Sequence, residues 1–61
     1  MRPYTVHVMT RRRGSLGVFS VRPFTVYATS TAHARDAWFA EFSEHWESNY
    51  IQSVNLYQGV E

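Results

Sequence analysis

The chain has 61 residues, no cysteine and a formal net charge of +1. This length allows one domain, residues 1–61, and the composition excludes disulfides and thiolate metal ligands. A domain of this size buries only about 60% of its unfolded surface, so we expect it to depend on bulky side chains or on self-association. Two Trp, four Tyr and four Phe residues supply the bulk.

The two halves of the chain carry opposite charge. Residues 1–30 contain five arginines and no acidic residue, whereas residues 31–61 contain one arginine and five acidic residues. Such asymmetry favours an anion-binding end or head-to-tail self-association. No apolar stretch approaches the roughly 18 residues that span a bilayer, and the N-terminus does not resemble a signal peptide. The sequence therefore predicts a cytoplasmic protein.

The first 28 residues favour a β-hairpin. Residues 4–12 are β-branched and aromatic with period two, which predicts a strand. Residues 13–17 contain two glycines and predict a turn. Residues 18–28 then resume the strand pattern.

Pro23 interrupts the second predicted strand. Phe19 and Val21 share one parity, whereas Phe24 and the alternate apolar residues after it share the other. A bulge or break at Arg22–Pro23 would bring both sets into the core, and proline tolerates only edge or bulged positions. We therefore expect a kinked strand at the edge of the sheet.

Hydroxyl residues at 29–31 offer N-caps for a helix over residues 31–46. One apolar stripe of this helix, which we expect to pack in the core rather than to bind a ligand, comprises Ala34, Trp38, Phe42 and Trp46, with Phe39 on its flank. Acidic and polar residues occupy the opposite side. Asn49 is expected to end the helix in the left-handed conformation.

Residues 50–57 predict a last strand, with Val54 and Leu56 pointing inward and Gly59 ending it. The element order is thus β-β-α-β. It predicts an α+β fold in which a three-stranded antiparallel sheet, in strand order 2-1-3, packs on one helix. The edge formed by the last strand is open to pairing with another chain.

Arg11, Arg12 and Arg13 are the most suggestive functional feature. Guanidinium forks bind carboxylates and phosphates, and a basic two-stranded ribbon can enter a nucleic-acid groove. Three interpretations stay open, namely a solvated turn, a site for protein carboxylates, and a contact with nucleic-acid phosphates. We expect Arg22 to contribute to the same half and the arginine tip to lie clear of the helix. The low net charge and the acidic helix favour a protein partner over nucleic acid.

No catalytic, metal or cofactor site is predicted. His33 and His45 lie about 120° apart around the predicted helix, and no histidine spacing fits a zinc site. No nucleophile elbow or glycine-rich phosphate loop occurs, and so short a domain has little room for a deep pocket. We therefore expect a non-enzymatic protein without a cofactor.

The outer face of the predicted sheet mixes tyrosine, methionine and small polar residues. Its members are His7, Met9, Tyr27 and Tyr57 among Thr5, Thr25, Ser53 and Asn55. Such a mixture is typical of a contact surface, suits the stacking of unpaired bases, and also occurs on solvated sheets. Tyr27 and Tyr57 join the four hairpin arginines as candidate partner-binding residues.

Residues Phe24–Ser30, followed by Ala32, Ala34 and Ala37 on a helix, resemble the strand-to-helix junction of small proteins encoded by bacteriophages and other mobile elements. The resemblance implies a tiny domain, often a dimer, that binds and inhibits a host protein or defence complex in the host cytoplasm. It carries over no site residue. We therefore expect a self-associating binding module with a protein partner, and nucleic-acid binding through Arg11–Arg13 is the alternative.

Overall fold

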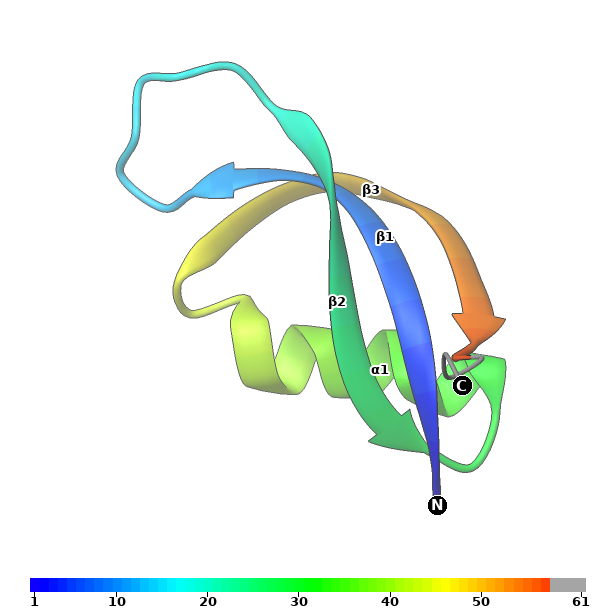
Figure 1. Cartoon of the computed structure of the whole chain (residues 1–61). Coiled ribbons are helices and arrows are strands. Elements are labelled where there is room, and N and C mark those ends of the chain that lie inside the picture. The colour runs from blue at the N-terminus through cyan, green and yellow to red at the C-terminus, as the bar shows by residue number, and fades with distance from the viewer. Residues whose placement is uncertain (58–61) are drawn as a thin grey trace.

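A computed structural model describes residues 1–57 and contains three strands and one helix (Figure 1). Strands β1 (Arg2–Arg12), β2 (Ser20–Ala28) and β3 (Trp46–Leu56) form one antiparallel sheet in the order β2-β1-β3. Helix α1 (Thr31–Phe42) connects β2 to β3. The predicted α+β class, the strand order and the edge position of β2 are confirmed.

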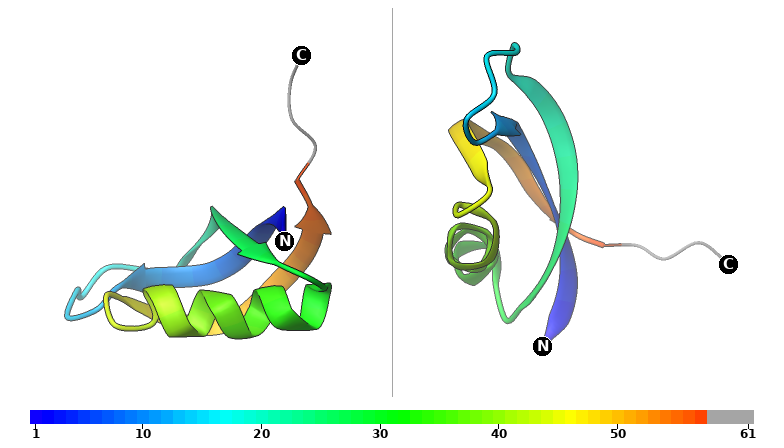
Figure 2. Two further views of the ribbon diagram at one scale, coloured as in Figure 1. Left: turned by 90° about the horizontal axis from the view of Figure 1, so that it is seen from below. Right: turned by 90° about the vertical axis from the view of Figure 1, so that its left-hand side faces the viewer.

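Helix α1 covers one face of the sheet, here called the inner face, and leaves the outer face open (Figure 2). The core lies between α1 and the inner face. It consists of the buried residues Tyr4, Val6, Val8, Val26, Ala28, Ala34 and Trp38. No helix within residues 1–57 is long and apolar enough to cross a membrane.

Strand β2 runs without the predicted bulge at Arg22–Pro23. It pairs with β1 residue for residue along its whole length, and Pro23 lies opposite His7 in an unbroken register. Because the register is regular, Val26 is buried against the helix while Val21 lies on the outer face. The expectation of a bulge is wrong because only one of the two apolar sets of β2 faces the core. The other set lies on the outer face of the sheet.

The irregularities occur instead in the pairing of β1 with β3. Two register shifts each leave one β3 residue, Asn49 or Gln52, without a partner on β1. These shifts allow Trp46, Ile51 and Val54 all to face the helix and to pack against the core. Bulges of this kind increase local twist and disrupt the pairing edge of a strand.

The C-terminal end of α1 differs from prediction. Ser30 caps the N-terminus as expected, and its side chain accepts a hydrogen bond from the His33 N–H. The helix ends at Phe42, so Trp46 begins β3 instead of continuing the helical stripe. Asn49 lies within β3, and no residue other than glycine has a positive φ among residues 1–57. The predicted helix end and the predicted left-handed cap are therefore both wrong.

Strand β3 is also longer at its start than predicted. It begins at Trp46 and ends at Leu56, which pairs with Tyr4 on the inner face but is exposed, so the inward position predicted for Leu56 does not bury it. Val54 is half-buried against the core. The strand end predicted at Gly59 lies outside the described residues.

The loop between β1 and β2 spans residues 13–19 and is longer than the predicted turn. Gly14 has a φ of +88°, a conformation that favours glycine, and it allows the chain to reverse after β1. The loop projects beyond the end of the sheet, on the side where α1 connects to β3 (Figures 1 and 2). This part of the molecule is called the hairpin end below.

Candidate binding site at the hairpin end

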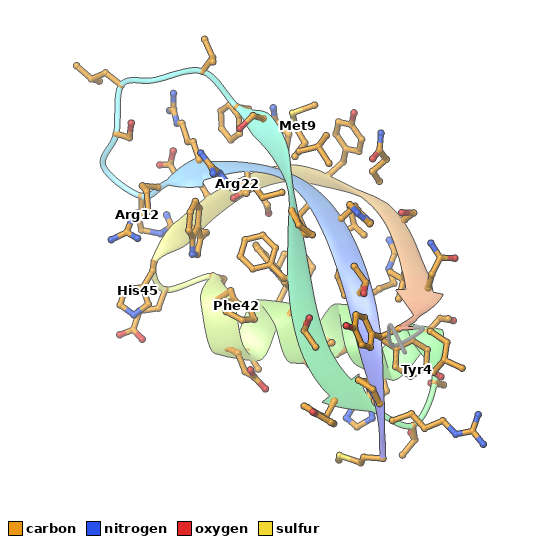
Figure 3. All side chains as sticks on the ribbon, viewed as in Figure 1. Tyr4, Met9, Arg12, Arg22, Phe42 and His45 are labelled. Carbon is orange, nitrogen blue, oxygen red and sulfur yellow. The ribbon has the colours of Figure 1, made fainter. Side chains whose placement is uncertain are left out.

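The four hairpin arginines occupy different environments although three of them are consecutive in sequence. Arg12 and Arg22 lie at the same end of the molecule as Phe42 and His45, far from Tyr4 (Figure 3). Arg11 and Arg13 instead direct their guanidinium groups onto the chain itself. The hairpin arginines therefore form two pairs: the guanidinium groups of Arg11 and Arg13 donate hydrogen bonds within residues 1–57, and those of Arg12 and Arg22 do not.

Arg11 fixes the loop to β3. Its Nε donates to Oε1 of Glu47 at 2.7 Å, and its Nη1 donates to the carbonyl oxygen of Gly17 at 2.9 Å. Its guanidinium carbon also lies 4.5 Å from the centre of the Phe19 ring, within the range of a cation–π contact. Two donors and one face of this guanidinium are therefore used within the fold.

Arg13 binds the end of α1. Its Nε and Nη2 donate to the carbonyl oxygen of Ser43 at 3.1 Å and 2.8 Å, and Nη2 also donates to the carbonyl oxygen of Trp46 at 3.2 Å. A cation satisfying the last carbonyl groups of a helix is favourable there. The expectation that the arginine tip lies clear of the helix is wrong for Arg13, because the early end of α1 brings its carbonyl groups next to the hairpin.

Arg12 and Arg22 both stack on Trp46. Each guanidinium carbon lies 5.3 Å from the centre of the Trp46 ring. The ring also makes an edge contact with Phe24 of β2 at 5.5 Å between centroids. Because β1 lies between β3 and β2, this contact requires the indole to extend across the inner face of β1.

Two apolar side chains project from the tip of the loop. Leu16 is 99% exposed and Val18 is 87% exposed, so neither contributes to the core. The loop around them is held by local hydrogen bonds, including one from the Gly17 N–H to Oγ of Ser15 at 3.0 Å. Sequence reasoning missed this feature, although two branched apolar residues between turn residues were its signal.

The outer face of the sheet carries the two tyrosines predicted to bind a partner. Tyr27 and Tyr57 flank Pro3 and are both exposed, and the Tyr57 N–H donates to the Pro3 carbonyl oxygen at 2.9 Å. Nearer the hairpin end, Met9 lies between Val21 and Tyr50 on neighbouring strands. The outer face therefore has apolar and aromatic side chains along its length, at a distance from Arg12 and Arg22 on the inner face.

The three histidines lie in separate places. His7 lies on the outer face with Nδ1 3.4 Å from Oγ of Ser53, and Nδ1 of His33 accepts from the Thr29 N–H at 3.1 Å. His45 precedes β3. Within residues 1–57 no three metal-ligating side chains converge, and no pocket is present.

Comparisons of the chain with models of protein families, with curated proteins and with solved structures find no match. The contacts described above therefore carry the assignment of function. The most distinctive features are at the hairpin end, which carries two exposed apolar side chains and two arginines over the Trp46 ring.

Proposed function

We propose that this chain is a small non-enzymatic module that binds another protein through its hairpin end. The observation that carries the proposal is the exposure of Leu16 and Val18 on a projecting loop. These two side chains bury almost no apolar surface within the fold, so both are available to pack against another protein, as apolar groups at interaction sites do. Following the resemblance to small phage-encoded proteins, we place the partner in the host cytoplasm and expect inhibition or regulation of it.

The surroundings of the loop tip support this proposal. Arg12 and Arg22 are exposed and lie at the hairpin end, from which the apolar loop also projects (Figure 3). An apolar centre beside polar groups that can pair with a partner is the usual composition of a protein interface, in which aromatic residues and arginine contribute most. The same end of the molecule thus offers both apolar contact and directed hydrogen-bond donors.

A protein partner also suits the hairpin better than the alternative, nucleic acid. Arg11 and Arg13 use their guanidinium groups within the chain, so fewer of the consecutive arginines are available to phosphates. Glu44, next to His45, adds negative charge near the same end, and Glu47 neutralises Arg11. Because nucleic-acid affinity grows with the number of phosphates neutralised, this arrangement favours a protein.

Site-specific cross-linking tests the proposal. A photoreactive amino acid is placed at Leu16 or Val18, and at Arg35 on the exposed side of α1 as the control, in cells that express the protein. We expect one and the same protein to be cross-linked from the two loop positions and not from Arg35. The proposal fails if Arg35 gives the same product or if the loop positions give none.

The cross-linked protein is then purified and its affinity for the chain is measured directly. We expect Leu16→Ser combined with Val18→Ser to weaken binding at least about tenfold, because truncating apolar anchors at an interface has effects of this size. Replacing Tyr27 and Tyr57 with Ala serves as the matched comparison on the outer face. If only the tyrosine variant loses affinity, the binding surface is the outer face and not the hairpin end.

We also propose that a second copy of the chain packs on the outer face. Arg11 and Glu47 are charged residues of this face, and they pair with one another at 2.7 Å. A face whose charges are already paired can pack on its own copy without opposing like charges, while Tyr27, Tyr50 and Val21 lose contact with water. Two sheets packed face to face would form a sandwich, a common arrangement for sheets with one open side.

Size-exclusion chromatography with light scattering tests the self-association. We expect a dimer mass at high micromolar concentration and a shift towards the monomer on dilution. A monomer mass over the whole concentration range removes the second copy from the proposal and leaves the hairpin end unaffected.

A further inference from the structure

The guanidinium groups of Arg12 and Arg22 make no hydrogen bond to the rest of the described chain. Within residues 1–57 neither group has a hydrogen-bond acceptor or a carboxylate partner, whereas Arg11 and Arg13 each have two or more acceptors. Two like charges in contact with one aromatic ring repel each other, and a bound anion would relieve that repulsion. The pair is therefore arranged as a receptor for negative charge.

Trp46 gives this pair a defined geometry. The two guanidinium carbons each lie 5.3 Å from its ring centre, so they are no further apart than twice that distance. Contact with the ring does not use the N–H donors, which have no acceptor within residues 1–57 and so remain available to a ligand. Such a fork loses less conformational freedom when it binds a planar anion than a free arginine side chain does.

The indole is itself held in place. Its ring contacts Phe24 edge-on at 5.5 Å, its carbonyl oxygen accepts from Arg13 at 3.2 Å, and its residue pairs with Arg12 in the sheet. Arg13 therefore supports the site indirectly, by fixing the backbone at Trp46 against the end of α1. The platform is part of the fold and does not have to form when a ligand arrives.

We propose that Arg12 and Arg22, stacked on Trp46, form a two-fork site for neighbouring carboxylates in an acidic peptide segment. Carboxylate oxygens match the in-plane donors of a guanidinium fork. This inference rests on the proposed protein partner and names the chemistry of the segment that meets the inner side of the hairpin. It adds carboxylate recognition to the apolar contact proposed for Leu16 and Val18.

Single-stranded nucleic acid fits the same cluster less well. Binding of unpaired bases relies on open aromatic faces, and here the guanidinium groups of Arg12 and Arg22 lie over the Trp46 ring. A long polyanion at this end of the molecule would also approach the exposed carboxylate of Glu44, which a short acidic segment can avoid. The test must therefore distinguish nucleic-acid binding from binding of an acidic peptide.

The test measures binding of fluorescently labelled hexaglutamate by anisotropy at low ionic strength. We expect Arg12→Gln with Arg22→Gln to weaken binding about tenfold, and Arg12→Lys with Arg22→Lys to weaken it about threefold because lysine keeps the charge and loses the planar fork. The control, Arg2→Gln with Arg35→Gln, removes the same charge from exposed positions elsewhere and should leave binding nearly unchanged. The proposal is overturned if the control weakens binding equally, or if a short oligothymidylate binds more tightly than hexaglutamate with the same dependence on Arg12 and Arg22.

A measurement on the unaltered protein guards against variants that fail to fold. In nuclear magnetic resonance titrations with hexaglutamate, we expect the Nε–H signals of Arg12 and Arg22 and the indole N–H of Trp46 to shift, and the Arg35 signal to stay in place. Absence of these shifts at saturating peptide rejects the carboxylate site. Cross-links from Leu16 would still support a binding module in that case, so the two proposals fail separately.

Discussion

Trp38 is the largest side chain that is completely buried, and its indole nitrogen Nε1 has no hydrogen-bond partner among residues 1–57. Its ring makes edge contacts with Phe24 at 5.4 Å and with Phe39 at 5.1 Å, so its value to the fold is packing. A buried donor without a partner loses its hydrogen bonds to water and gains none in the fold, which lowers the free energy of unfolding by about 1–3 kcal/mol. The core thus contains one polar atom that destabilises it.

Replacing Trp38 separates these two effects. We expect Trp38→Phe to change the free energy of unfolding by less than about 1.5 kcal/mol, because removal of the unpaired N–H offsets part of the lost packing. Trp38→Ala should cost about 3–5 kcal/mol, which is close to the whole stability of so small a domain. Urea denaturation followed by circular dichroism measures both. Equal losses in the two variants would show that Nε1 has a partner in solution.

Arg13 is a second residue whose function in the fold can be tested alone. Arg13→Ala removes three hydrogen bonds to the Ser43 and Trp46 carbonyl oxygens, and Arg13 is about half exposed. Because water replaces bonds at an exposed site, we expect a loss of only about 1 kcal/mol. Arg35→Ala, on the exposed side of α1, should stay within about 0.5 kcal/mol of the unaltered chain. A larger effect at Arg35 than at Arg13 in the same denaturation experiment would contradict the capping function.

Among the elements, α1 is short and depends on its ends. It has 12 residues, a length at which an isolated helix is marginal, and only Ala34 and Trp38 are fully buried. Ser30 closes its N-terminus by accepting from the His33 N–H, and Arg13 closes its C-terminus from the hairpin. The helix is thus stabilised by two polar contacts in addition to one line of packing.

Ser30→Ala tests the N-terminal contact. We expect a loss of about 1 kcal/mol and a lower melting temperature, because the His33 N–H loses its side-chain acceptor. Ser30→Asp keeps an acceptor and places a negative charge at the positive end of the helix dipole, so it should be at least as stable as the unaltered chain. Thermal denaturation of the three proteins gives the comparison. An Asp variant as unstable as the Ala variant would argue against side-chain capping.

Strands β2 and β3 form the two edges, and each is unsuited to pairing with another sheet. Pro23 provides no backbone N–H in the middle of β2, while the unpaired Asn49 and Gln52 break the regular edge of β3. The open edge predicted for the last strand is therefore interrupted by these bulges. This is why the self-association proposed here uses the outer face and not an edge.

At the scale of the whole molecule, the two faces of the sheet differ in what they pack against. The inner face forms the core with α1 and, beyond the helix end, carries the Arg12–Trp46–Arg22 cluster. The outer face has no cover within residues 1–57 and carries Met9 on its central strand. Self-association through the outer face would leave the hairpin end free to bind a partner.

Met9→Lys tests whether the outer face is the dimer surface. A charge in the centre of this face would oppose its symmetry mate across the interface, so we expect a monomer mass and a melting temperature that no longer rises with protein concentration. Ala40→Lys adds the same charge on the exposed side of α1 and should keep the mass of the unaltered chain. A dimer that survives in the Met9 variant would place the contact elsewhere.

Local sequence patterns determined the element order and the strand topology of this protein. Alternation along residues 4–12, the hydroxyl cap at Ser30 and the apolar spacing of Ala34 and Trp38 each depend on neighbours within about four positions. Those contacts form in any arrangement that buries the apolar face. They therefore predicted the α+β class and the position of β2 at the edge.

Only the tertiary structure decided where Trp46 lies and what each arginine contacts. The spacing of apolar residues is consistent with Trp46 on a longer helix or at the start of a strand. Trp46 belongs to the strand because it pairs with Arg12, which is far away in sequence. Once the helix ends at Phe42, Arg13 reaches the Ser43 carbonyl oxygen, and both Arg12 and Arg22 lie over the Trp46 ring. Such contacts join residues more than twenty positions apart, and no local pattern contains them.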